Sequence, residues 1–78
     1  MKDIGSIFGA SIRRRRQELG LSQEELADEA GLHRTYVSLL ERGLRSASIV
    51  TIVKLARALK TTGSELLKGI KLDNHGRA

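Results

Sequence analysis

The apolar residues of this chain recur at helical rather than alternating spacing, and the chain contains no proline. A first helix is predicted over roughly residues 4 to 19, because its apolar residues fall on one side. These residues are Ile4, Ile7, Phe8, Ile12 and Leu19. Gly20 then ends the helix, since glycine readily adopts the left-handed turn that follows many helices. The whole pattern predicts an all-α fold.

Two shorter helices are predicted next, joined by a turn that contains glycine. Ser22 and Glu25 have the spacing of a capping box, so a helix starts there and covers about residues 23 to 30. Gly31 is a stop signal, and a third helix spans "HRTYVSLLERG" and ends near Gly43. The core-facing residues of the two helices are Leu26, Ala27, Ala30, Tyr36, Val37 and Leu40. This arrangement is that of a helix-turn-helix, although the periodicity alone also fits a plain five-helix bundle.

A fourth helix is predicted over about residues 49 to 60, with Ser48 as its cap. On a helical wheel its core-facing residues are Ile49, Ile52, Val53, Leu55, Ala56 and Leu59. The residues that face away are Val50, Thr51, Lys54, Arg57 and Ala58. The pattern therefore predicts a core helix with a solvent-exposed back.

A fifth helix is predicted to start with Ser64 as its cap. The residues that it offers to the core or to a partner are Leu66, Leu67 and Ile70. We expect a single domain over residues 1 to 78, with a core from about 4 to 70 and a frayed tail from 71 to 78.

Charge and composition restrict the partners. The net charge is +5 and the pI is about 10.3, which favours an anionic partner such as nucleic acid or an acidic membrane surface. The absence of cysteine excludes a disulfide framework. The few aromatic residues argue against a protein that binds single-stranded nucleic acid by stacking bases on aromatic side chains. No apolar run approaches the roughly 18 residues that span a bilayer, so we expect a cytoplasmic protein. A membrane-surface role for the first helix would use the apolar face that the core needs.

The third helix has a polar side that suits the major groove of DNA. Arg34, Ser38 and Arg42 follow one another at four-residue intervals, with Thr35 and Leu39 beside them. The guanidinium of Arg34 matches the two acceptors of guanine, and Thr35 and Leu39 suit a thymine methyl. Each of these residues also has a simpler interpretation as part of a solvated helix surface.

Contacts to phosphate are expected on both sides of this helix. Ser22 and Gln23 open the second helix, where free amides and the positive end of the helix dipole attract anions. Arg42 and Arg45 lie at and beyond the end of the third helix and are placed to grip the flanking backbone. The alternatives are a cap without DNA contact for the first pair and a solvated side chain for Arg45.

Two further residues near the turn are assigned to the DNA side. We expect Tyr36 to pack beside the core with its hydroxyl near a phosphate, and His33 to lie at the helix start near DNA. Neither His33 nor His75 has a metal ligand at a suitable interval, and no phosphate loop or nucleophile motif occurs. The sequence therefore predicts no enzyme, no cofactor and no metal site.

The run "RRRR" at residues 13 to 16 does not form one patch, because successive helix residues point in different directions. Arg16 lies at the edge of the apolar face and needs a partner, for which Glu41 is the candidate. We assign this pair a structural role and expect Arg13 and Arg14 to be solvated.

The string "IRRRRQELGLSQEELADEAGLHRTYVSLLERG", followed by "TIVKLARAL", resembles the lambda-repressor-like helix-turn-helix domains of the Cro/C1 (XRE) type over roughly residues 12 to 70. Within this family, "RTYVSLLERGLRS" is similar to the controller proteins of restriction-modification systems, while short phage regulators and antitoxins share much of the pattern. The resemblance implies a compact five-helix fold, a phosphate contact by Gln23 and a charge pair of Arg16 with Glu41. Ser48 stands where relatives often carry proline, but it keeps the cap function.

These expectations combine into a transcriptional regulator that binds double-stranded DNA. The family implies a homodimer on palindromic operators. We interpret the chain as the controller protein of a restriction-modification system, with RNA polymerase as a further partner. We assign the dimer interface to Val50, Ile70 and Leu72. The alternative is an antitoxin or phage-type repressor whose main partner is another protein, and it predicts an exposed apolar patch without salt-sensitive DNA binding.

Overall fold

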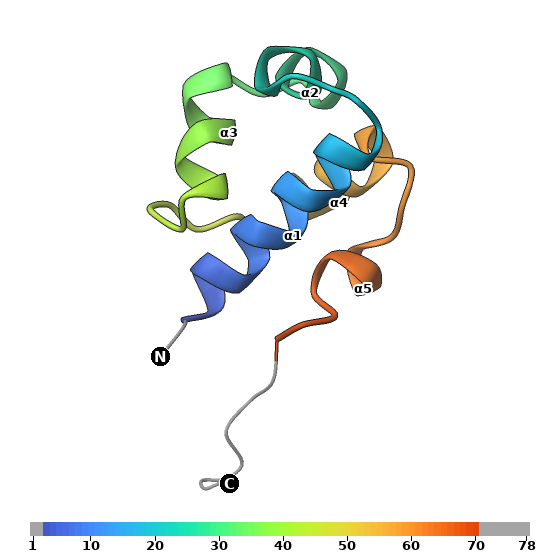
Figure 1. Cartoon of the computed structure of the whole chain (residues 1–78). Helices are drawn as coiled ribbons and strands as arrows, with labels where there is room; N and C mark the ends of the chain where they lie inside the picture. Colours follow the sequence, from blue (N-terminus) through green and yellow to red (C-terminus); the bar gives the residue numbers. More distant parts are fainter. Residues whose placement is uncertain (1–2, 71–78) are drawn as a thin grey trace, which may run out of the picture.

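The computed structural model describes residues 3–70 and forms helices at the expected places (Figure 1). The helices are α1 (Ile4–Glu18), α2 (Gln23–Ala30), α3 (Arg34–Glu41), α4 (Ile49–Ala58) and α5 (Gly63–Leu66). No strand occurs in these residues, and the all-α expectation is confirmed. The predicted ends of the first and fourth helices lie one or two residues beyond the observed ends, a usual uncertainty at helix termini.

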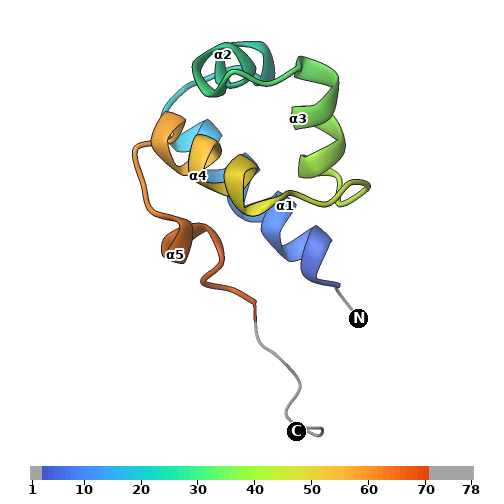
Figure 2. The same cartoon turned by 180° about the vertical axis from the view of Figure 1, so that it is seen from behind.

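The helices enclose one cluster of buried apolar side chains. α1 packs against α3 and α5, while α2 packs against α3 and α4. Seen from behind, α4 lies in front of α1, and α5 follows below it (Figure 2). The buried apolar residues are Phe8, Ile12, Leu26, Ala27, Ala30, Val37, Leu40, Leu55, Ala56, Leu59 and Leu66.

Local hydrogen bonds fix where most helices begin. The Asp3 carboxylate accepts from the backbone N–H of Ser6 at 2.7 Å and caps α1. Ser22 and Glu25 form the predicted capping box of α2, with Ser22 Oγ accepting at 3.0 Å and Glu25 Oε1 accepting at 2.8 Å. Ser48 caps α4 as predicted, by accepting from the N–H of Thr51. These starts depend on residues three positions apart, so the sequence alone specifies them.

The predicted cap of α5 is wrong. Thr62, not Ser64, is the N-cap, and its hydroxyl accepts from the N–H of Glu65 at 3.1 Å. Thr62 has a glutamate three residues later, the spacing that favours a helix start, and Ser64 has none.

The predicted apolar face of α4 is also partly wrong. Ile49 is 80% exposed and Val53 is 50% exposed, while Thr51, predicted to face away, is buried. Burial of Thr51 is tolerated because its hydroxyl oxygen accepts a hydrogen bond from Ser48 Oγ at 3.1 Å. The apolar residues of this helix lie on several of its sides, so the periodicity of its sequence does not predict which face is buried. Ile4 of α1 is likewise exposed rather than part of the core.

Two glycines allow α1 to approach the end of α3 closely. A Cβ atom at Gly9 would lie only 2.3 Å from the backbone oxygen of Leu40. Gly43 follows α3 with a φ of +74°, and a Cβ there would meet Ser6 Oγ at 2.7 Å. Any larger residue at Gly9 would push α1 and α3 apart, and this crossing sets the position of α3.

Candidate nucleic-acid interface

α3 has one face in the core and one face in solvent, as its sequence predicted. Val37 and Leu40 are buried, while Arg34 and Thr35 are exposed at the start of the helix. The two half-buried residues at the border of these faces are Ser38 and Leu39. The helix lies at the edge of the molecule, with nothing of the described chain covering its outer side (Figure 1). This face can therefore enter a groove without rearrangement of the core.

The start of α2 adds hydrogen-bond donors next to α3. The hydroxyl and backbone of Ser22 are engaged in the capping box with Glu25. The backbone N–H groups of Gln23 and Glu24 precede the first bond of the helix, which Leu26 donates to the carbonyl of Ser22. Donors at a helix start attract phosphate, because the helix dipole adds partial positive charge there.

The charge pair expected between Arg16 and Glu41 is formed in the structure. Arg16 Nε donates to Glu41 Oε2 at 2.6 Å, and Arg16 Nη2 donates to Glu41 Oε1 at 3.0 Å. Arg16 Nη1 also donates to the carbonyl of Leu21 at 2.8 Å. The side chains of Arg16 and Glu41 are only 12% and 3% exposed. The hydrogen bond to Glu41 raises the pKa of Arg16, against the opposing effect of burial.

The loop after α3 is anchored by Tyr36. The Tyr36 hydroxyl donates to the carbonyl of Ser46 at 2.9 Å, and the guanidinium of Arg45 lies 5.7 Å from the centre of the Tyr36 ring. In this arrangement the hydroxyl hydrogen of Tyr36 is used within the chain, and only its oxygen remains as an acceptor. Donation of this hydrogen to a phosphate, the role expected from the sequence, would require the bond to Ser46 to break.

The predicted DNA-side residues come from the start of α2, from α3 and from the loop after α3. Those that are exposed are Ser22, His33, Arg34, Thr35, Arg42 and Arg45. Those that are half-buried are Gln23, Tyr36, Ser38 and Leu39. His33 is the N-cap of α3, and its side chain makes no capping hydrogen bond. All ten are therefore at least partly accessible to solvent, and their contacts with DNA remain a prediction.

Two contacts between distant segments, one at this site and one at the end of α4, were missed by the sequence analysis. Gln23 Nε2 donates to Glu41 Oε1 at 3.0 Å, which joins the first residue of α2 to the last residue of α3. Arg15, to which we assigned no role, donates to the carbonyls of Leu59 and Lys60 at the end of α4. Both contacts join residues far apart in the chain, so no local sequence pattern predicts them.

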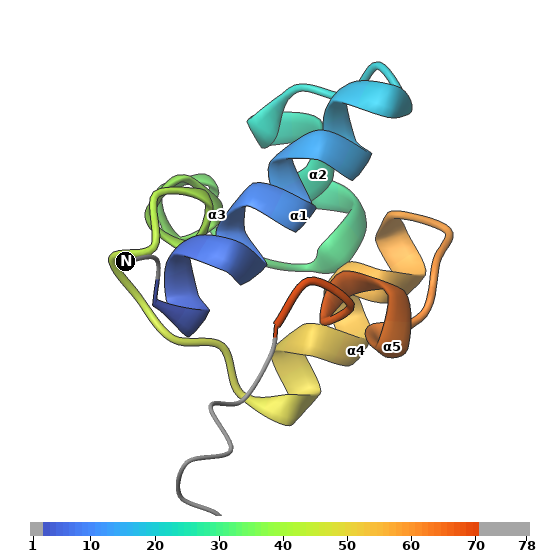
Figure 3. The same cartoon turned by 60° about the horizontal axis from the view of Figure 1, so that its bottom comes forward.

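The residues assigned to a dimer interface have different surroundings. Val50 is 63% exposed on α4, beside the exposed Ile49 and Val53. Ile70 packs against the core and is half-buried, and Leu72 lies outside the described residues. Viewed from below, α3 lies on one side of α1, and α4 and α5 lie on the other (Figure 3). The helix that carries the exposed Ile49, Val50 and Val53 is therefore separated from α3 by α1.

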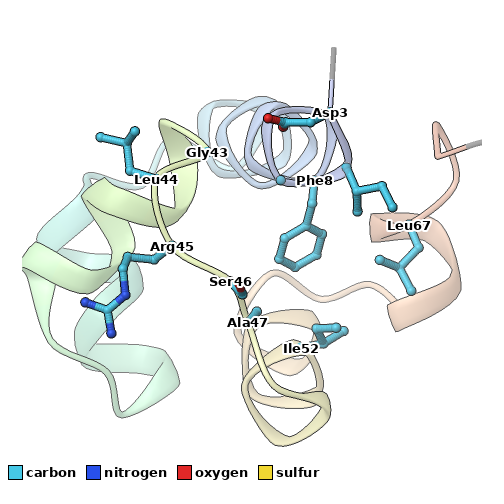
Figure 4. Close-up of a pocket in the computed structure, with 11 residues that line it drawn as sticks. Asp3, Phe8, Gly43, Leu44, Arg45, Ser46, Ala47, Ile52 and Leu67 are labelled. Atoms are coloured by element: carbon cyan, nitrogen blue, oxygen red, sulfur yellow. The ribbon is translucent and has the colours of Figure 1, made fainter. Parts of the chain in front are cut away.

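A groove of about 400 Å³ lies between the start of α1, the loop after α3, α4 and α5. Phe8 points into it, with Ile52 and Leu67 beside it, while the guanidinium of Arg45 points away (Figure 4). Its apolar wall does not suit an anion. Within residues 3–70 there is also no group of three or more residues able to hold a metal, and no helix long and apolar enough to cross a membrane.

Comparison with known proteins gives consistent matches. The helix-turn-helix family model HTH_3 matches residues 12–66. The control protein C.SmaI of Serratia marcescens is 42% identical over 71 residues, which cover 88% of this chain and 84% of that protein. The crystal structure of the restriction-modification controller protein C.AhdI from Aeromonas hydrophila has a TM-score of 0.77 and 49% identity, covering 78% of this chain and 92% of that chain. The biofilm regulator SinR, solved in complex with DNA, has a TM-score of 0.74 and 36% identity over 77% of this chain and 97% of that chain. The family match begins in α1 and ends with α5, so it includes the helices that support the helix-turn-helix.

Proposed function

Since this chain belongs to the HTH_3 helix-turn-helix family of DNA-binding transcriptional regulators, we propose that it is a restriction-modification controller protein that binds palindromic double-stranded operators as a homodimer. The resemblance and the lambda-repressor-like fold expected from the sequence are confirmed, and the chain is not an enzyme. Similarity to C.SmaI and C.AhdI supports the controller assignment. Such a regulator acts in the cytoplasm, and RNA polymerase is a further partner where its operator adjoins a promoter.

The observation that carries the proposal is the exposed polar face of α3. Arg34 and Thr35 project from the first turn of a helix whose opposite side, Val37 and Leu40, is fixed in the core. In this proposal Arg34 reads a guanine through its two parallel donors, and Thr35 lies beside it on a neighbouring base. Ser38 and Leu39 contact bases further along the groove.

Contacts to phosphate hold the helix in register without reading sequence. Ser22 and Gln23 contact the DNA strand on one side of α3, together with the backbone amides that precede the first hydrogen bond of α2. Arg42 and Arg45 contact phosphates of the DNA strand on the other side of α3, and the Tyr36 ring restricts where Arg45 can lie. His33 lies at the start of α3, close to the bound backbone.

A homodimer is supported by the exposed apolar residues of α4. Complete burial of a valine or isoleucine side chain is worth about 1.5 to 3 kcal/mol, and Ile49, Val50 and Val53 leave half or more of their surface exposed. In this proposal the two-fold axis lies beside α4, and each protomer presents its own α3 to one half-site. Ile70, and Leu72 outside the described residues, complete the proposed interface.

The proposal is tested by selecting bound sequences from random duplexes and titrating the best one with salt. We expect a palindrome whose half-site centres lie about 34 Å apart or a multiple of that, and an affinity that falls steeply with salt. A flat salt response would refute DNA binding. An asymmetric single site would refute the symmetric dimer.

The dimer has its own test in Val50→Glu, measured by analytical ultracentrifugation. Glutamate in the first turn of α4 suits the helix dipole, so the variant should fold and yet become monomeric. Ala10→Glu, on the exposed side of α1, is the matched control and should remain a dimer. A monomeric unmodified chain that also lacks salt-sensitive DNA binding would favour the antitoxin or phage-type alternative, in which the apolar residues of α4 bind another protein.

A further inference from the structure

The side-chain amide of Gln23 is held by the same carboxylate that neutralises Arg16. Glu41 Oε1 accepts from both Arg16 Nη2 and Gln23 Nε2, each at 3.0 Å, while Glu41 Oε2 accepts from Arg16 Nε. Glu41 is the last residue of α3, Gln23 the first of α2, and Arg16 belongs to α1. One buried carboxylate therefore joins three helices at the edge of the DNA-side surface.

This contact decides which way the Gln23 amide faces. An ionised carboxylate only accepts hydrogen bonds, so the NH₂ group of Gln23, and not its oxygen, must face Glu41. One N–H is then fixed on Glu41, and the direction of the second N–H is fixed with it. Gln23 is half-buried and lies beside the free backbone amides of the first turn of α2. Its second N–H is not used in this bond and is available to a ligand beside these backbone amides.

We propose that Glu41 is a positioning residue for DNA binding: it holds the Gln23 amide with its second N–H directed at a backbone phosphate. A glutamine side chain that is free in solution loses rotational freedom when it binds, and that loss weakens affinity. Because Glu41 already restricts the Gln23 side chain in the free protein, less rotational freedom is lost when DNA binds. The inference rests on the proposed function, since it requires a DNA-bound state. It also gives the Arg16–Glu41 pair a role in binding besides its role in the fold.

The test is a double-mutant cycle in DNA affinity at one salt concentration. Gln23→Ala should weaken binding of the full-length protein by about five-fold per half-site, the order expected for one preordered side chain and its contact. The exposed Gln17→Ala is the matched control and should leave affinity unchanged. The second background replaces both members of the buried pair, as Arg16→Leu with Glu41→Leu, which removes the anchor without leaving a lone buried charge.

In the double-leucine background, with helical content checked by circular dichroism, Gln23→Ala should cause less than a two-fold further loss, because the amide is already unpositioned. An equal loss in both backgrounds would show that Glu41 does not position Gln23. No loss from Gln23→Ala in the natural background would also overturn the inference, while leaving the salt-dependent DNA binding of the proposed function intact.

A second measurement needs no variant that alters the core. In the unmodified free protein, the NMR signals of the Gln23 side-chain amide should differ from those of Gln17, with one proton shifted and protected from exchange by its bond to Glu41. On addition of operator DNA the other Gln23 proton should shift, and a methylphosphonate at the contacted phosphate should abolish that shift. Gln23 signals identical to those of Gln17 in the free protein would refute the positioning, whether or not the double-leucine variant folds.

Discussion

Removing the Glu41 side chain should destabilise this fold far more than removing an exposed charge on α1 or α3. In Glu41→Ala the guanidinium of Arg16 loses its two bonds to the carboxylate and keeps only the bond to the carbonyl of Leu21. The charge of Arg16 stays in place, because its side chain is almost fully enclosed. The variant therefore contains a buried charge without a counter-charge.

The size of the effect follows from this burial. Removing one partner of a buried ion pair costs about 3 to 5 kcal/mol, and residual solvent contact of Arg16 places the loss near the lower end, about 3 kcal/mol. A domain of this length has a free energy of unfolding of about 4 to 12 kcal/mol. The melting temperature should fall by about 12 to 24 °C, at about 4 to 8 °C per kcal/mol.

Thermal and urea unfolding followed by circular dichroism measure this loss, with two controls. Arg13→Ala removes an exposed charge on the same helix as Arg16 and should change the free energy of unfolding by less than about 0.5 kcal/mol. Replacing both Arg16 and Glu41 by leucine should recover most of the lost stability, because no lone charge remains. Equal melting temperatures for Glu41→Ala and Arg13→Ala would refute the reasoning. A double-leucine variant as unstable as Glu41→Ala would show that the loss does not come from the uncompensated charge.

Three other predictions follow from the structure. Arg34→Ala should leave folding intact, lower the affinity for the cognate duplex by about 1 to 3 kcal/mol and relax the preference at one base position per half-site. Arg42→Ala should instead weaken binding to cognate and random duplexes alike, because a phosphate contact carries no sequence information. If Arg34→Ala weakens binding to both duplexes equally, Arg34 contacts phosphate and not a base. Gly9→Ala should lower the free energy of unfolding measured in urea by about 2 kcal/mol or more, since its Cβ would overlap backbone oxygens. The control Gly5→Ala should be tolerated, because the atom nearest to its Cβ would be 3.4 Å away. Equal stabilities of the two variants would contradict the close crossing of α1 and α3. The bonds to Ser6 lower the pKa of Asp3 from its ordinary value of 3.8, so the stability from this cap should be present above pH 3.8 and lost as the pH falls through the lower folded pKa. An NMR titration of the Asp3 carboxyl checks the direction, and Asp3→Asn, which keeps a capping oxygen, should remove this pH dependence without removing the cap.

The separation of α3 from α4 allows the proposed DNA-binding and dimer surfaces to be tested independently. The helices α3 and α4 lie on different sides of α1 (Figure 3). A substitution on α4 can therefore change assembly without touching the residues proposed to read DNA. The Val50→Glu and Arg34→Ala variants should accordingly fail in different assays.

The sequence by itself determined the features that depend on residues three or four positions apart. The capping box of Ser22 with Glu25 and the two faces of α3 follow from local spacing, because a helix brings such residues together whatever surrounds it. The same spacing was present at Thr62 and Glu65, where the cap was assigned to Ser64 instead. That error was one of interpretation, since the local signal existed.

Only the tertiary structure decided the features that depend on packing between distant segments. The helix α4 has apolar residues on several sides, so its neighbours determined that Thr51 is buried and Ile49 exposed. Gly9 looks like an ordinary helix residue until the end of α3 crosses it. Gln23 and Glu41 are 18 positions apart and meet only because α2 and α3 fold back on each other. Local hydrogen bonds fix where a helix begins, but the side it buries and the groups it meets depend on the shape of the whole core.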